Sequence, residues 1–294
     1  MAARAIDAAA LRTVHVSAVP EAQKALYFDE NRAAMRPNLV FVDPTGAIIF
    51  ETNEAGLKGG PLDPNHKLVV VWGDSVVFGA GWGWPCLIDR LAPGWQFLNG
   101  GVEGDHYANI LRRAAEFNRR HPVSLNLLML GWHPFVPLRP ERRRARRSAA
   151  QSAERRRLRP GNEDIRSDLT RFLETVPSTA VLTVPTALNP QIIDRDLSSF
   201  IVEGDDRSAF RFMGKVRYQM AGQRQGFEHI VERNAIAREV CDTAGIRLID
   251  LFAAFDTENL ADFREHFIDM IHFRPSAYPL VAQRVYDGIQ DLLA

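Results

Sequence analysis

Cysteine is scarce in this sequence, whose 294 residues include only Cys86 and Cys241. The two stand far apart and form neither a CxxC pair nor a mixed Cys/His spacing, so neither a disulfide framework nor a zinc site is expected. A reducing cytoplasm is therefore the predicted location. Charge of one sign is also lacking, because 36 Lys and Arg residues balance 36 Asp and Glu residues. A net charge of zero argues against a nucleic-acid-binding protein, which would carry a basic excess.

Long apolar runs are absent as well. No stretch approaches the roughly 18 apolar residues that a membrane span needs. The Ala-rich start is interrupted by Asp7, Arg12 and His15, so it has no uninterrupted apolar region of the kind found in secretory signals. Two nucleotide-binding patterns are missing too, since there is no GxxxxGK[ST] loop and the glycines of FGAGWGW do not have the GxGxxG spacing. We therefore expect no membrane association and no nucleotide cofactor.

Short apolar runs alternate with helical patterns between residues 68 and 293. The runs are continuous, which is typical of strands buried on both faces. The predicted strands are Leu68–Trp72, Gln96–Leu98, Leu125–Leu130, Ala180–Val184 and Arg247–Asp250. The predicted helices are Trp84–Leu91, Tyr107–Arg119, Glu163–Thr175, Phe227–Thr243 and Ala277–Leu293. This alternation predicts a three-layer α/β/α sandwich with a parallel sheet, which would bind ligands at the carboxyl ends of its strands.

Residues 1–66 precede the first strong strand and are predicted to be an extension packed on the main domain, residues 67–294. Within the extension, Pro44-Thr45-Gly46 separates two apolar runs and predicts a β-hairpin. Residues 185–224 show weak periodicity and are a candidate lid. Residues 139–159 hold ten arginines against two glutamates. We expect that segment to be an exposed helix or loop, and a polyanion- or partner-binding arm is the alternative.

The first candidate for chemistry is Ser75, in Gly73-Asp74-Ser75 directly after the first predicted strand. A hydroxyl at such a strand end points into the crevice, where backbone N–H groups at a helix start can stabilise an oxyanion. A serine nucleophile needs a base, and the base needs an orienting partner. His272 follows Asp269 by three residues, just before the final predicted helix. One turn could therefore present both side chains to the same crevice.

Position distinguishes this DxxH pair from a second one. Asp63 and His66 have the same spacing, but they precede the first predicted strand. A DxxH pair by itself is a weak signal, because roughly 0.5 matches are expected by chance in a chain of this length. Only the Asp269–His272 pair follows the fifth strand, at the edge where ligands are expected.

Four sequence blocks together resemble the SGNH, or GDSL-type, family of serine esterases and lipases. VVVWGDSVVFGAG is similar to the first block of that family, FLNGGVEGD to the second and IDMIHFRPSAYPLVA to the last, while LLMLGWHPF stands where the third belongs. Upstream, ETNEAGLKGGP is similar to a lead-in segment of a bacterial subgroup, with Lys58 where Arg is usual. The resemblance covers most of residues 50–294 and implies a flavodoxin-like order of five parallel strands.

The resemblance also implies roles for individual residues. Ser75, His272 and Asp269 would form the catalytic triad, and the backbone N–H groups of Ser75 and Gly104 would receive the oxyanion. The third block departs from the family, because His133 stands where an Asn side chain usually donates. A histidine ring nitrogen can also donate, so His133 is a candidate oxyanion donor, with a packing role as the alternative. The candidate substrate contacts are Asp74, Trp82 and Trp132.

The predicted reaction is hydrolysis of a carboxylic ester with a small acyl group, such as an acetylated sugar or metabolite, through an acyl-enzyme. It requires no metal and no organic cofactor. Two alternatives stay open. An acyltransferase would use the same triad with an alcohol in place of water, and a non-catalytic descendant of the fold would bind a partner.

Overall fold

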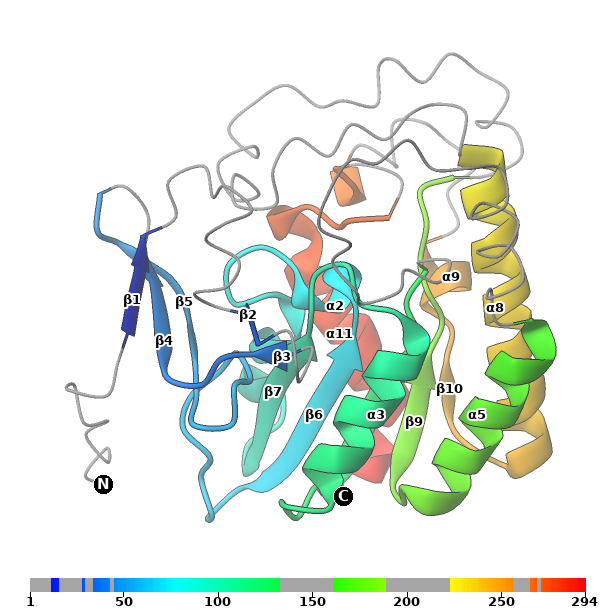
Figure 1. The fold of residues 1–294 in the computed structure, drawn as a ribbon, viewed down its shortest axis with the longest axis horizontal. Helices are drawn as coiled ribbons and strands as arrows, with labels where there is room; N and C mark the ends of the chain where they lie inside the picture. Colours follow the sequence, from blue (N-terminus) through cyan, green and yellow to red (C-terminus); the bar gives the residue numbers. More distant parts are fainter. Residues whose placement is uncertain are drawn as a thin grey trace, which may run out of the picture.

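The computed structural model describes residues 12–15, 28–29, 34–42, 45–132, 161–188, 223–255, 265–268 and 271–294. Its core is a five-stranded parallel sheet in the order β7-β6-β8-β9-β10 (Figure 1). The strands are β6 (Lys67–Gly73), β7 (Trp95–Gly101), β8 (Leu125–Met129), β9 (Thr179–Leu182) and β10 (Leu248–Ile249). This order confirms the predicted flavodoxin-like sheet. It also places the end of β6 at the point where the strand order reverses, which is where open α/β sheets bind ligands.

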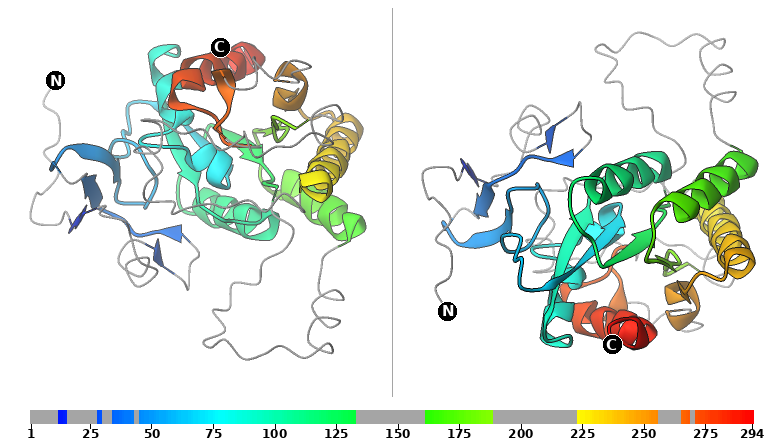
Figure 2. Two further views of the ribbon diagram at one scale, coloured as in Figure 1. Left: turned by 90° about the horizontal axis from the view of Figure 1, so that it is seen from above. Right: turned by 90° about the horizontal axis from the view of Figure 1, so that it is seen from below.

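Helices cover both faces of the sheet (Figures 1 and 2). They are α2 (Ser75–Phe78), α3 (Tyr107–Asn118), α5 (Asn162–Thr175), α8 (Gln223–Ala244), α9 (Leu251–Ala254) and α11 (Tyr278–Ile289), with the 3₁₀-helices η2 (Trp84–Arg90), η6 (Pro275–Ala277) and η7 (Gln290–Leu292). The predicted helix Trp84–Leu91 is thus a 3₁₀-helix. It is short and lies between Gly83 and Pro93-Gly94, and short helical segments commonly take the tighter i→i+3 pattern.

Alternate residues of the central strands face different helical layers. Val69 and Val71 pack in one apolar cluster with α11 and η2, whereas Val70 and Trp72 pack in another with α3, α5 and most of α8. All four side chains are at most 1% exposed. Burial on both faces explains why these strands show no alternation of apolar and polar residues in the sequence.

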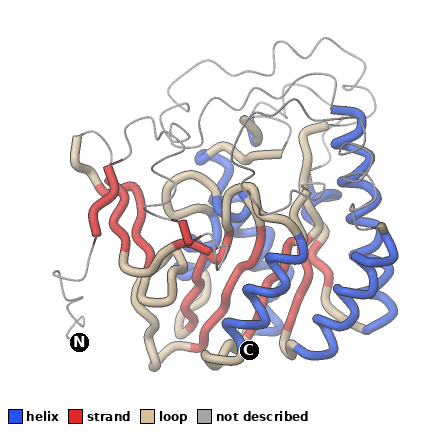
Figure 3. Tube along the Cα trace, in the orientation of Figure 1, coloured by secondary structure: helices blue, strands red, loops and turns tan. Residues whose placement is uncertain are grey.

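The N-terminal part forms a smaller sheet beside the core sheet (Figure 3). Its strands β1 (Arg12–His15), β4 (Leu39–Val42) and β5 (Ile48–Thr52) lie in the order β1-β4-β5, and β4 and β5 pair antiparallel on either side of residues 43–47. Two short strands, β2 (Phe28–Asp29) and β3 (Ala34–Met35), form a separate pair. The rings of Phe41 and Phe50 stack at 4.1 Å, and Phe50 meets Phe78 edge-on at 5.7 Å. The N-terminal sheet therefore packs directly on α2.

The Arg-rich segment and most of the predicted lid are not among the described residues. These are residues 139–159 and residues 189–222. Among the helices that are described, none combines the length and the apolar character needed to cross a membrane.

Candidate active site

Ser75 and His272 are hydrogen-bonded to each other. Ser75 begins α2 immediately after β6, and its Oγ lies 2.8 Å from Nε2 of His272. The two residues are 3% and 4% exposed. The backbone on either side of His272 is paired, because the Ile268 N–H donates to the His272 carbonyl at 2.8 Å and the Arg274 N–H to the His266 carbonyl at 2.8 Å. The structure thus brings together two of the three predicted triad residues, while Asp269 lies outside the described residues.

Asp74 connects the start of α2 to the loop after β8. One carboxylate oxygen accepts from the Val76 N–H and caps α2, and the other accepts from the Trp132 N–H, each at 3.0 Å. Gly131 has a φ of +73°, and a Cβ there would lie 2.9 Å from the Asp74 carboxylate. Asp74 is also fully buried. Asp74 was expected to contact substrate. Both of its carboxylate oxygens instead accept from backbone N–H groups at the site.

The loop that carries the expected oxyanion donor Gly104 is anchored by a buried ion pair. Arg113 of α3 lies 2.6 Å from an Asp105 carboxylate oxygen, and both side chains are nearly inaccessible. The same guanidinium donates to the carbonyls of Gly100 at 2.7 Å and Gly73 at 3.3 Å, at the carboxyl ends of β7 and β6. Gly104 itself is exposed and has a φ of +72°. The ion pair thus fixes the loop against the strand ends beside Ser75.

The other expected contacts differ in placement. Trp132 directly follows Gly131, is 9% exposed and belongs to the same apolar cluster as Val76. Trp82 is half-buried and packs on the apolar cluster that includes Phe78. His133, the expected third oxyanion donor, lies outside the described residues.

The second DxxH pair lies at the opposite end of β6. Nδ1 of His66 is 2.8 Å from an Asp63 carboxylate oxygen, and the side chains are 41% and 39% exposed. The pair precedes Lys67, where β6 begins, whereas Ser75 follows its end. The structure therefore keeps Asp63 and His66 away from Ser75.

Two polar residues not expected at the site hold the turn after Ser75. The Lys58 ammonium group donates to the carbonyls of Phe78, Gly79 and Gly81, and the Asn99 amide donates to those of Val77, Phe78 and Trp82. Lys58 is 1% exposed, and this burial holds the pKa of its amine well below the ordinary value. In the sequence, Lys58 could be singled out only by its place in the lead-in segment ETNEAGLKGGP, and nothing marked Asn99.

Arg233 of α8 is a third buried cation near the site. Its guanidinium donates to the Gly131 carbonyl at 2.9 Å. Its Cζ lies over the Tyr107 ring, 5.7 Å from the ring centroid. Burial lowers its pKa, while the negative charge of Asp74 raises it. Arg233 and Asp74 therefore both hold the loop after β8, Arg233 at the Gly131 carbonyl and Asp74 at the Trp132 N–H. Nothing in the periodicity of the helix marks it, because an arginine on an amphipathic helix is ordinarily exposed.

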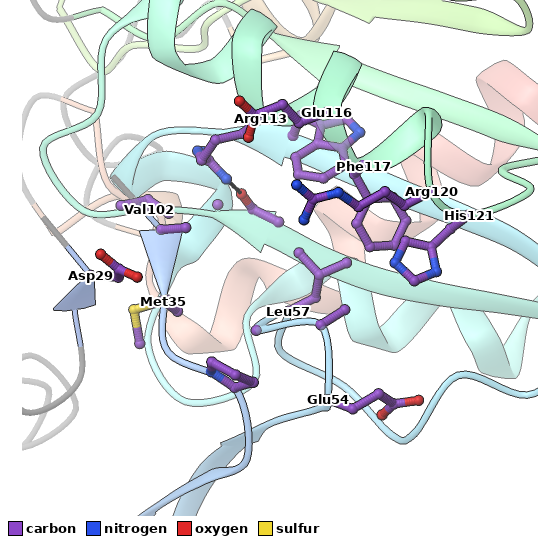
Figure 4. A pocket seen from close by; sticks show the side chains of 17 residues that line it. Asp29, Met35, Glu54, Leu57, Val102, Arg113, Glu116, Phe117, Arg120 and His121 are labelled. Carbon is purple, nitrogen blue, oxygen red and sulfur yellow. Dashed lines mark hydrogen bonds between the residues drawn. The ribbon is translucent and has the colours of Figure 1, made fainter. Parts of the chain in front are cut away.

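A cavity of about 190 Å³ lies beside the anchoring Arg113 (Figure 4). Side chains from α3 and the residues just after it form one wall, and residues of β2 and β3 face them. Neither Ser75 nor His272 lines the cavity. Within the described ranges, no group of three His, Cys, Asp or Glu side chains could hold a metal ion.

The sequence matches no known family model and no curated protein. Among solved structures, a lipase/acylhydrolase from Enterococcus faecalis is similar with a TM-score of 0.51 and 16% identity, over 76% of this chain and 96% of that chain. An α/β-hydrolase enzyme from the metagenome of Lake Arreo, Spain, has a TM-score of 0.48 and 16% identity, over 79% and 98%. A catalytic mutant of an acetylxylan esterase from Geobacillus stearothermophilus has a TM-score of 0.48 and 12% identity, over 78% and 95%. The chain therefore has the fold of the Enterococcus lipase/acylhydrolase.

Proposed function

We propose that the protein is an SGNH-type serine hydrolase that cleaves carboxylic esters through an acyl-enzyme on Ser75. The observation that carries the proposal is the 2.8 Å hydrogen bond between Ser75 Oγ and His272 Nε2 at the carboxyl edge of the sheet. A nucleophile and base within hydrogen-bond reach are the signature of this chemistry. The order of the four sequence blocks and the shared fold support the same conclusion.

In the proposed mechanism, Oγ of Ser75 attacks the ester carbonyl while Nε2 of His272 takes the hydroxyl proton. Asp269 orients the imidazole and stabilises its charged form. The oxyanion is received by the backbone N–H groups of Ser75 and Gly104, with His133 as third donor. The imidazolium then gives its proton to the departing alcohol as the C–O bond breaks. A water molecule then attacks the acyl-enzyme carbonyl while His272 takes its proton. The bond between Ser75 Oγ and the acyl carbon breaks as that proton returns to Oγ, and the acid is released.

The surroundings of Ser75 favour this role and a small acyl group. Its N–H lies at the first position of α2, where a helix amide has no partner within the helix and can donate to an oxyanion. Ser75 and His272 are 3% and 4% exposed, so solvent reaches very little of the reacting groups. An acetyl ester is therefore the preferred substrate in this proposal.

The test is hydrolysis of p-nitrophenyl esters with acetyl, butyryl and octanoyl groups. We expect the acetyl ester to react fastest, and Ser75→Ala to lower kcat by roughly 10⁴-fold or more. Ser276→Ala is the matched control, because Ser276 is exposed in η6 and should leave kcat unchanged. Unchanged turnover in Ser75→Ala would end the proposal. Product analysis with added alcohols separates hydrolysis from acyl transfer.

A further inference from the structure

We propose that Lys58 is a positioning residue for the nucleophile, whose ammonium group holds the turn that carries Ser75. The effect of Lys58 on catalysis rests on the proposed function, whereas its role in holding the turn does not. Lys58 lies 17 positions before Ser75 in the sequence, in a segment with no regular helix. Its side chain reaches the far end of α2 and meets three carbonyl oxygens there.

The three contacts match the three protons of an ammonium group. Nζ of Lys58 lies 2.7 Å from the Phe78 carbonyl oxygen, 2.8 Å from that of Gly81 and 3.3 Å from that of Gly79. An ammonium group is a compact point donor with three N–H bonds, whereas a guanidinium is a planar fork. Convergent carbonyls of this kind therefore fit lysine better than the arginine that is usual in the lead-in segment.

These carbonyls need a donor because α2 has a single turn. The last carbonyls of a helix have no partner within it, and leaving such groups buried and unpaired is costly. Gly79 and Gly81 have φ values of +58° and +56°, so the chain cannot continue as a helix. Lys58 and Asn99 together serve the carbonyls of residues 77, 78, 79, 81 and 82.

One peptide group separates Lys58 from the nucleophile. The Phe78 carbonyl accepts from Lys58, and the N–H of the same peptide group, that of Gly79, donates to the Ser75 carbonyl at 3.0 Å. Movement of the Phe78–Gly79 peptide would therefore shift the first residue of α2. Because a displacement of about 1 Å at a reacting group can cost roughly 10²-fold in rate, this link bears on catalysis.

Lys58 is itself held rigidly. Its backbone pairs with Asn99 on β7 through two hydrogen bonds of 3.0 and 2.9 Å. Its Nζ lies over the rings of Phe78 on α2 and Phe50 on β5, 3.1 and 4.3 Å from their centroids. Within the described residues it forms no ion pair, and the titratable groups that act on it are Cys86 of η2 and Glu103 after β7. Burial lowers the pKa of its amine, and loss of the proton would weaken its hold on the turn.

The first test compares Lys58→Met with Lys67→Met, a matched control in which the ammonium group is exposed over Trp95. We expect Lys58→Met to increase amide hydrogen exchange in residues 76–83 at least 10-fold. We also expect it to lower kcat for an acetyl ester at least 10-fold with little change in KM. Lys67→Met should change neither. Unchanged exchange and kcat in folded Lys58→Met would overturn the proposal.

The wild type provides a second test if Lys58→Met does not fold. Hydrogen exchange in residues 76–83, relative to the rest of the sheet, should rise as the Lys58 amine loses its proton, with the titration followed by NMR of the labelled Cε. Protection that is insensitive to this titration would contradict the proposal. If the wild type neither hydrolyses esters nor reacts with serine probes, the proposed function fails, but the exchange results still decide the role of Lys58.

Discussion

His272 and Ser75 share a 2.8 Å hydrogen bond although 197 positions separate them in the chain. A second hydrogen bond joins residues 198 positions apart in the chain, because the Ala80 N–H donates to the Tyr278 hydroxyl at 2.6 Å. Residues 75–80 and residues 272–278 are thus joined at two points. The C-terminal segment is a structural part of the site and carries His272, the proposed base.

The two DxxH pairs give a controlled comparison. His272→Ala should lower kcat for a small ester by roughly 10³-fold or more, because it removes the base that contacts Ser75. His66→Ala should leave kcat within about twofold, since His66 pairs with exposed Asp63 at the other end of β6. Steady-state kinetics of both variants decide the matter. Equal losses would mean that the wrong pair was assigned.

The two neighbouring arginines of α3 should differ in their effect on stability. Arg113→Met should lower the free energy of unfolding by about 3–5 kcal/mol, because it leaves the Asp105 carboxylate buried without its partner. Arg112→Met breaks the ion pair with Glu116, in which the two side chains are 38% and 35% exposed. It should lower the free energy of unfolding by less than about 1 kcal/mol. Urea unfolding followed by circular dichroism measures both. A loss below 1 kcal/mol for Arg113→Met would contradict the anchoring role.

Both cysteines should be unreactive in the native protein. Burial raises the pKa of Cys86 and of Cys241 to about 12, with Asp89 adding to the effect at Cys86 and Asp242 at Cys241. At pH 8 only about one thiol in 10⁴ would be a thiolate, and the thiolate is the reactive form. Iodoacetamide at pH 8 should therefore leave ester hydrolysis intact and label cysteines only after denaturation, as mass spectrometry can show. Rapid inactivation by this reagent would point to a thiol at the site.

His133 can be tested through its expected role in the transition state. His133→Ala should lower kcat by roughly 10²–10³-fold with little change in KM, as expected for loss of an oxyanion donor. His133→Asn should keep most of the activity, because the amide can point an N–H at the same oxygen. A histidine donor titrates near neutral pH and an amide does not. Full pH–rate profiles should therefore differ between wild type and His133→Asn, and identical rates in all three proteins would exclude the role.

The sheet was predictable from the sequence because its strands are buried on both faces. The run Leu68–Trp72 falls within β6, the other predicted strands overlap observed ones with ends that differ by at most three residues, and glycines and prolines mark the turns between elements. The positions of Ser75 and His272 relative to the strands then place both at one edge. The order of the strands came from the family resemblance, since alternation of strands and helices alone allows several orders.

The supporting residues were harder to predict for a physical reason. Lysine and arginine are ordinarily exposed, so a sequence pattern gives no sign that Lys58, Arg113 and Arg233 are buried. Each donates to backbone carbonyls that the fold brings to it: three of one turn at Lys58, two strand ends at Arg113 and the Gly131 carbonyl at Arg233. Such convergence depends on tertiary structure, as does the use of both Asp74 oxygens by the backbone.

The most direct test of Ser75 as the nucleophile is covalent labelling by a fluorophosphonate probe, followed by peptide mapping. Activated serine nucleophiles displace fluoride from such probes and retain the phosphonyl group on Oγ. We expect one modified residue, Ser75, with labelling abolished in Ser75→Ala, strongly slowed in His272→Ala and unchanged in Ser276→Ala. Absence of labelling in the folded wild type, or a label that maps to another residue and persists in Ser75→Ala, would contradict the assignment of Ser75 as the nucleophile.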